Sequence, residues 1–238
     1  MKRKITTITL VMFALLLMTQ IVFAEVTAPT SLNKVTSSRR DLSALPDQQQ
    51  AVIAGNVTQL SLDVLTTTKS WAGAYGNISG TITLDNSNND TFYNWTGITA
   101  DGEIYASRVD INDFSSVQCA TETDKETEDA ALNNDASASD NVNKTFATKN
   151  APDFNVGTVS ITGSNCYHTN AFNSGGAQTA DFHQVLLDDG SNNMIYTTLI
   201  NGSKTGFDGN AWDFEMLLAE DGHGNSATTN YYFWVELN

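Results

Sequence analysis

The sequence has few basic residues, and this shortage limits the partners that the protein can bind. It contains 12 Lys and Arg against 27 Asp and Glu, which gives a formal net charge of −15 at pH 7. Proteins bind nucleic acids and anionic membranes through clustered basic side chains that neutralise phosphates. We therefore predict no nucleic-acid partner. An acidic surface instead favours solubility and leaves divalent-cation binding open.

Catalytic motifs are also missing. Only three histidines occur, His168, His183 and His223, and they are not spaced as metal ligands. No Gly-x-Ser-x-Gly, His-Glu-x-x-His or phosphate-loop motif is present. A glycosidase would need two carboxylates across a cleft, and Glu103 and Glu215 on predicted strands are the pair that could be placed so. Because any acidic β protein offers such pairs, we predict no catalytic residues and expect a protein that is not an enzyme.

Cysteine is scarce, with only Cys119 and Cys166 in the chain. Two cysteines in an exported protein most simply form a disulfide, and zinc would need more Cys or His nearby. Chain-entropy arguments give a bridge across this loop roughly 4 kcal/mol of stabilisation. We expect the bridge to fix an insertion at 120–165 to the rest of the domain.

Long apolar runs are absent except at the N-terminus. Lys2, Arg3 and Lys4 precede the apolar run 5–18, and small residues stand at Val22 and Ala24. This order is typical of a signal peptide cleaved after Ala24. We predict that 1–24 is removed, that no membrane span remains, and that the protein is extracellular or attached to the cell surface.

The mature chain divides into a leader and one domain. Residues 25–50 are rich in Thr, Ser and Gln and lack periodicity, which predicts a flexible leader. The alternative is a donor strand that pairs with a neighbouring molecule. Residues 51–238 are interpreted as a single domain. Its first strand is expected within 51–65, where apolar and polar residues alternate in VTQLSLDVL.

Residues 71–95 have the pattern of a β-hairpin, which we take as the centre of the fold. Apolar residues lie on both sides of the polar turn NSNND, as is typical of hairpins. A related pattern returns later in the chain without a gap. Leu84, Asp85, Asn89, Phe92 and Tyr93 match Leu187, Asp188, Asn192, Ile195 and Tyr196. We expect the same kind of hairpin at both places.

The rest of the chain predicts further strands and a short helical region. Residues 98–111 predict a hairpin that turns at Asp101-Gly102, and 157–162 predict a strand. Residues 212–219 and the aromatic-rich 231–237 predict a final pair, with the last strand central in the sheet. The acidic stretch 121–150 predicts helices at 124–132 and 140–146, capped by Thr123 and Ser139. The fold class is therefore all-β: an antiparallel β-sandwich, jelly-roll or Ig-like, with a small helical insertion near 121–150.

Two signatures connect the chain to a known group of proteins. These are Trp-x-Gly-x-Tyr-Gly-Asn at 71–77 and Gly-Phe-Asp-Gly at 206–209. With NCYHTNAF and the C-terminal YYFWVEL, they resemble an uncharacterised group of secreted or cell-surface proteins found mainly in archaeal genomes. The resemblance covers most of 54–238. It implies an extracellular or cell-surface location and brings no catalytic residues.

Surface chemistry supplies the remaining candidate sites. Asn-x-Ser/Thr sequons predict glycosylation at six positions: Asn56, Asn77, Asn89, Asn94, Asn143 and Asn201. We expect exposed glycans at the turn residues Asn89 and Asn201, whereas Asn77 and Asn94 lie close to predicted core aromatics. Carboxylates in the two related turns are candidate Ca²⁺ ligands, namely Asp85, Asp90, Asp188 and Asp189, although tight turns favour Asp for reasons of their own.

These observations favour a non-enzymatic structural or adhesive protein of the cell envelope. The partners we expect are further copies, other surface proteins or glycans. The alternative is a carbohydrate-binding module in which exposed aromatics stack on sugars. Trp71 and Tyr75, beside glycines at a strand entry, are the candidates for that role, although most aromatics of a β-sandwich lie in the core. A glycan-active hydrolase is the third hypothesis.

Overall fold

The computed structural model describes residues 25–41, 46, 48–95, 101–221 and 228–237, so the predicted signal peptide 1–24 lies outside the described residues. Antiparallel sheets dominate the described residues, which also contain two short α-helices, and the predicted fold class is confirmed. No helix among the described residues is both long enough and apolar enough to cross a membrane.

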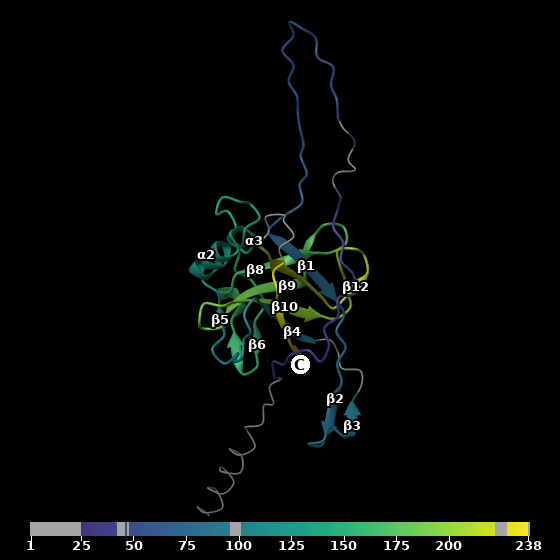
Figure 1. Cartoon of the computed structure of the whole chain (residues 1–238), viewed down its shortest axis with the longest axis vertical. Coiled ribbons are helices and arrows are strands. Elements are labelled where there is room, and N and C mark those ends of the chain that lie inside the picture. The colour runs from purple at the N-terminus through teal and green to yellow at the C-terminus, as the bar shows by residue number, and fades with distance from the viewer. Residues whose placement is uncertain (1–24, 42–45, 47, 96–100, 222–227, 238) are drawn as a thin grey trace, which may run out of the picture.

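A six-stranded antiparallel sheet forms the centre of the domain (Figure 1). The strand order is β14-β4-β10-β9-β5, and β8 also pairs with β9. Its strands are β4 (Asp101–Ser107), β5 (Gln118–Cys119), β8 (His168–Phe172), β9 (Gln178–Asp188), β10 (Met194–Asn201) and β14 (Tyr232–Leu237). The second predicted hairpin, β9–β10, is thus the middle of the fold.

Both faces of this sheet are buried, because successive side chains of a strand point to opposite faces. In β4, Ile104 and Ala106 belong to one core cluster, whereas Tyr105 between them belongs to the other. In β9, Leu186 lies in the first cluster and Leu187 in the second. The central strands therefore carry continuous apolar runs, since each face needs its own cover.

The first face is covered by the two-stranded sheet of β1 (Trp71–Gly76) and β13 (Phe214–Ala219). Met216 and Leu218 of β13 face the main sheet and are buried. Gln184 of the main sheet accepts the Leu217 N–H through Oε1 at 2.8 Å and donates to the Leu217 carbonyl at 2.6 Å. This side chain pairs both backbone groups of Leu217 and so ties β13 to the main sheet.

The second face is covered by the ribbon of β6 (Phe154–Val156) and β7 (Val159–Ile161) and by the loop after β4. The buried carboxylate of Glu236 joins ribbon and sheet. It accepts a hydrogen bond from the Tyr105 hydroxyl at 2.9 Å and another from the Gly157 N–H, also at 2.9 Å. Burial raises the pKa of Glu236, and these two hydrogen bonds oppose that rise.

The helical insertion contains α2 (Glu122–Ala131) and α3 (Val142–Thr145). Both helices begin near the predicted positions, but the predicted caps are wrong. Thr121 caps α2 in a reciprocal capping box with Asp124, and Asn141 caps α3. The box was missed because its third position holds Asp instead of the usual Glu or Gln.

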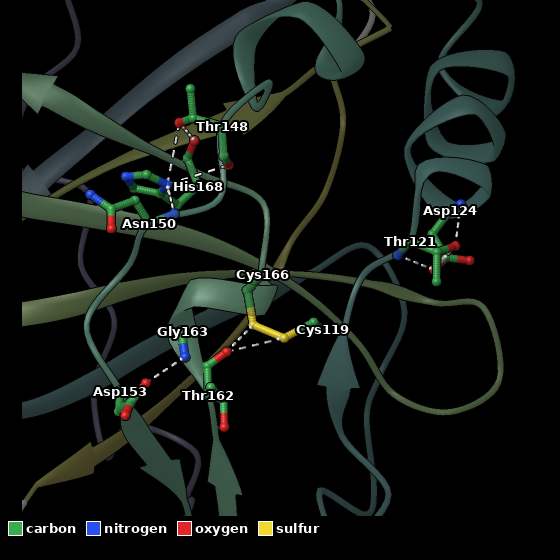
Figure 2. Close-up of a disulfide and its surroundings, with 10 residues drawn as sticks. All are labelled: Cys119, Thr121, Asp124, Thr148, Asn150, Asp153, Thr162, Gly163, Cys166 and His168. Atoms are coloured by element: carbon green, nitrogen blue, oxygen red, sulfur yellow. Dashed lines mark hydrogen bonds between the residues drawn. A yellow bond between two sulfur atoms is a disulfide. The ribbon is translucent and has the colours of Figure 1, made fainter.

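The predicted disulfide between Cys119 and Cys166 is confirmed (Figure 2). It links β5 to the residue that follows the short 3-10 helix Gly163–Asn165. The loop it closes contains α2, α3, β6 and β7. Near the bridge, the Gly163 N–H donates to Asp153 Oδ1 at 2.9 Å, which fixes the entry to this turn.

The structure corrects a predicted strand pairing and a predicted turn. The final two strands do not pair: β13 pairs with β1, and β14 pairs with β4 at an edge of the main sheet. Thr27 forms a short antiparallel bridge with Val235, so the start of the leader lies on this edge. Gly102 is not a turn residue but lies in β4. A Cβ on Gly102 would lie 2.1 Å from the Glu236 carbonyl oxygen, so close pairing with β14 requires glycine there.

Two predicted β elements lie outside the body. The hairpin of β2 (Ile82–Asp85) and β3 (Thr91–Trp95) extends away from the sandwich, and all its residues are exposed (Figure 1). It is therefore peripheral, contrary to the prediction that the fold is organised around it. Residues 56–65 form no strand, although their pattern predicts one. In both cases the apolar side chains are exposed and do not pack on the described part of the body.

Candidate functional site

The two sequence signatures meet in space on the outer face of the β1–β13 sheet. Tyr75 of the first signature contacts Phe207 of the second, with 4.9 Å between the ring centroids. Trp212 packs against the same tyrosine, also at 4.9 Å. The second signature forms the tight loop between β11 (Lys204–Thr205) and β12 (Ala211–Trp212). The two motifs thus build one aromatic cluster.

Each residue of the Gly-Phe-Asp-Gly loop has a definable role in this cluster. A Cβ on Gly206 would lie 2.4 Å from Glu215 Oε1 and 2.5 Å from the Trp212 ring, so only glycine fits. Asp208 accepts hydrogen bonds from the Asn210 N–H at 3.0 Å and the Trp212 indole N–H at 2.9 Å. Gly209 has φ of 84°, a conformation that favours glycine.

Glu215 lies at the centre of the cluster. It is the cross-strand neighbour of Tyr75 and points away from the main sheet, because its neighbour Met216 points into the core. Its Oε1 accepts the Phe207 N–H at 2.8 Å. Only 5% of the residue is exposed, and burial raises the pKa of its carboxyl group. The site therefore holds a largely desolvated carboxyl group beside aromatic rings.

A groove of about 990 Å³ opens over this face. Tyr75 and Phe207 line it and are 38% and 50% exposed. Its other sides are formed by the edge strand β8 with Asn170 and Phe172, by the end of α3, and by leader residues 36–38. Exposed aromatic faces beside amide and carboxyl groups are the chemistry with which proteins hold polar ligands that have apolar faces.

The structure separates the two aromatic candidates. Tyr75 lies in the groove, but Trp71 is half-buried and packs on Phe146 and Tyr196 of the core, at 5.9 and 6.3 Å between centroids. Its indole N–H donates to the Asp140 carbonyl at 2.5 Å. The predicted ligand-binding role of Trp71 is therefore corrected to a packing role between β1 and the helical insertion.

Glu103 and Glu215 do not share a cleft. Glu103 lies in β4 on the same face as Tyr105, beside Glu236 on the neighbouring strand. Glu215 lies in the other sheet and faces the groove, which Glu103 does not line. The structure thus does not bring together the carboxylate pair that a glycosidase would require.

The four candidate Ca²⁺ ligands serve the hairpin turns. Asp189 Oδ1 accepts the Ser191 and Asn193 N–H groups at 2.8 and 3.1 Å. Asn86 Oδ1 accepts the Asn88 and Asp90 N–H groups in the same way, both at 2.9 Å. The other carboxylates also accept hydrogen bonds within or next to these turns: Asp85 from Thr83, Asp90 from Asn86, and Asp188 from Gly190.

The structure thus gives these carboxylates a role in turn formation. Within the residues it describes, no group of three or more His, Cys, Asp or Glu side chains is arranged to hold a metal ion.

The sequons differ in their accessibility. Asn56, Asn77, Asn89 and Asn94 are exposed, although Asn77 and Asn94 were expected near the core. Asn143 and Asn201 are half-buried. Asn143 accepts a hydrogen bond from Lys125 Nζ at 3.0 Å, and the Asn201 amide donates to the Asp181 carbonyl at 3.1 Å. The expected exposed position of Asn201 is therefore corrected.

Sequence reasoning missed β8 and the contact between the signatures. β8 has the short pattern HTNAF, which lacks alternation, and it forms only by pairing along β9. The contact of Tyr75 with Phe207 joins segments far apart in the chain. No known protein family matches the chain, and no curated sequence or solved structure matches it either.

Proposed function

We propose that the protein is a secreted or cell-surface glycoprotein without enzymatic activity, and that it has a structural or adhesive role in the cell envelope. One observation carries this proposal. The β2–β3 hairpin projects from the body and presents an apolar face that is exposed among the residues the structure describes. Exposed apolar patches on exported domains are typical of contact surfaces.

The sequons support the same proposal. Asn94 pairs with Thr83 across the hairpin, so both point to the face opposite the apolar pairs Leu84–Tyr93 and Ile82–Trp95. A glycan on Asn94 therefore leaves the apolar face open. Glycosylation and contact formation can coexist on this hairpin.

The experiment is size-exclusion chromatography with light scattering on residues 25–238 over a range of concentrations, with and without millimolar calcium. We expect species larger than the monomer that grow with concentration. A protein that stays monomeric throughout would contradict the structural role. Glycopeptide mass spectrometry on protein from its native host should find occupancy at the four exposed sequons and none at Asn143 or Asn201.

A second function, carbohydrate binding, is favoured by the groove at Tyr75, Phe207 and Glu215. Tyr75 and Phe207 offer half-exposed rings for stacking on a sugar face, and Asn170 offers amide hydrogen bonds. A glycan array followed by titration calorimetry tests it. Tyr75→Ala should abolish binding, whereas Tyr232→Ala, at a more exposed tyrosine outside the groove, should not. An array without signal above background contradicts this function.

A further inference from the structure

The β2–β3 hairpin is an incomplete sheet. It has two strands, and all nine of their residues are exposed. Its apolar face consists of Ile82, Leu84, Tyr93 and Trp95, each exposed by 49–57%. An isolated two-stranded hairpin is marginal in water and is stabilised by a third strand or by packing. The described part of the body supplies neither.

Residues 57–65, here called the donor segment, have the pattern of a strand but do not pair with one. They form no strand, yet Leu60, Leu62 and Val64 alternate with polar residues and would share one face of an extended chain. These three side chains are exposed by 52–90%. The donor segment thus has the pattern of a strand whose partner is missing.

The two incomplete elements lie at opposite ends of the molecule (Figure 1). The blue chain that contains the donor segment extends beyond one end of the sandwich, and β2 and β3 extend beyond the other. The donor segment is held in place where the chain enters β1 at Trp71. Its own hairpin therefore lies at the far end of the sandwich, whereas the hairpin of another copy can approach it directly.

We propose that the donor segment of one copy adds as a third strand to the β2–β3 hairpin of a second copy. This inference rests on the proposed structural role and names its partner and its surfaces. Backbone hydrogen bonds along the free edge of the hairpin provide the affinity. Leu60, Leu62 and Val64 extend the apolar face of the hairpin. Because the donor segment continues through Ser70 into β1, the body of the donor molecule is brought close to this face.

The charge distribution favours a second copy as the occupant. Residues 26–40, on the N-terminal side of the donor segment, carry Lys34, Arg39 and Arg40 and no acidic residue. Residues 70–238 carry 23 acidic and 5 basic residues. The leader of one molecule is thus attracted to the body of another, which steers the donor segment towards an acceptor.

The geometry of the contact determines the kind of assembly. Donor and acceptor are different surfaces of the same chain, so the contact is heterologous. Because these surfaces lie at opposite ends of the molecule, repeated addition generates a head-to-tail chain.

Two charge substitutions and their mixture test this proposal. Leu62→Asp disables the donor segment, and Tyr93→Asp disables the apolar face of the acceptor hairpin. The matched controls are Leu32→Asp, at an exposed leader residue outside the donor segment, and Phe92→Asp, at an exposed aromatic on the opposite face of the hairpin. All four positions are exposed, so circular dichroism and the melting temperature should match the wild-type protein.

Light scattering should show growing multimers for the wild-type protein and both controls, and monomers for each disabled variant alone. An equimolar mixture of Leu62→Asp and Tyr93→Asp should give a dimer that grows no further. One intact donor then meets one intact acceptor, and the two remaining surfaces are disabled.

Other outcomes overturn the proposal in distinguishable ways. Multimers that persist in both disabled variants overturn the strand addition but leave the structural role intact. Loss of assembly in Tyr93→Asp alone shows that the hairpin contacts something other than the donor segment. A wild-type protein that stays monomeric overturns the structural role as well.

Discussion

Asn89 and Asn192 occupy the same position in the two related hairpin turns, each with φ of 65°. This left-handed conformation is unfavourable for most side chains and acceptable for Asn and Gly. The equivalence extends to the chemistry of the turns, since Asn86 in the first and Asp189 in the second accept the equivalent N–H groups. One turn design therefore serves a central hairpin and a projecting one.

Because the two equivalent turns lie in different parts of the molecule, the same substitution should change the free energy of unfolding by different amounts. Asn192→Ala should lower the free energy of unfolding by roughly 1–2 kcal/mol, because alanine is strained in the left-handed region. Asn89→Ala should leave the global transition unchanged, because its hairpin projects from the body. Urea denaturation measures both, and glycine at each position serves as the control. An equal loss in the two alanine variants would contradict the peripheral role of β2–β3.

The disulfide should contribute strongly to stability. Replacing Cys119 and Cys166 together by Ser opens a loop of 47 residues, which corresponds to roughly 4 kcal/mol of chain entropy. We expect a large drop in the denaturation midpoint of the double variant, with the β-sheet circular dichroism spectrum retained in the absence of denaturant. If the free energy of unfolding fell by less than about 1 kcal/mol, the insertion would be held mainly by its other contacts.

Lys125 connects α2 to α3. Its buried ammonium donates to Asn143 Oδ1 at 3.0 Å and to the Phe146 carbonyl at 3.1 Å, and it lies 3.5 Å from the centroid of the Tyr167 ring. Lys125→Ala should destabilise the protein by roughly 2–4 kcal/mol, because two charge-assisted hydrogen bonds are lost and a buried carbonyl is left unpaired. Lys144→Ala, at an exposed residue of α3, should change stability by less than about 0.5 kcal/mol.

Stability should depend on pH through Glu215. Burial raises the pKa of this carboxyl group in the folded state. The folded protein therefore binds the proton more tightly than the unfolded chain. The resulting stabilisation is fully present below the ordinary glutamate pKa of about 4.3 and is lost as pH rises through the raised value.

Glu215→Gln should remove this contribution, so its stability relative to the wild-type protein should increase as pH rises from the ordinary glutamate pKa of about 4.3 through the raised pKa of Glu215. Denaturation at a series of pH values measures this difference, with Glu126→Gln on the exposed side of α2 as the control. A difference that is constant with pH would contradict a raised pKa.

The sequence alone determined the local structure. The polar turns, the apolar runs along β4, β9 and β10, and the two helices follow from backbone preferences and local side-chain pattern, which act within a few residues. The cysteine pair followed from composition, because two cysteines have one way to pair within a chain.

Only the tertiary structure decided which elements meet. The sequence could not show that β14 pairs with β4, that Tyr75 contacts Phe207, or that Trp71 faces the core. These contacts join distant segments, and many pairings satisfy the same alternation. For the same reason, the patterns of 57–65 and β2–β3 predicted strands within the sandwich. A strand pattern specifies an apolar face but not the surface that covers it, and here both faces are exposed among the residues that the structure describes.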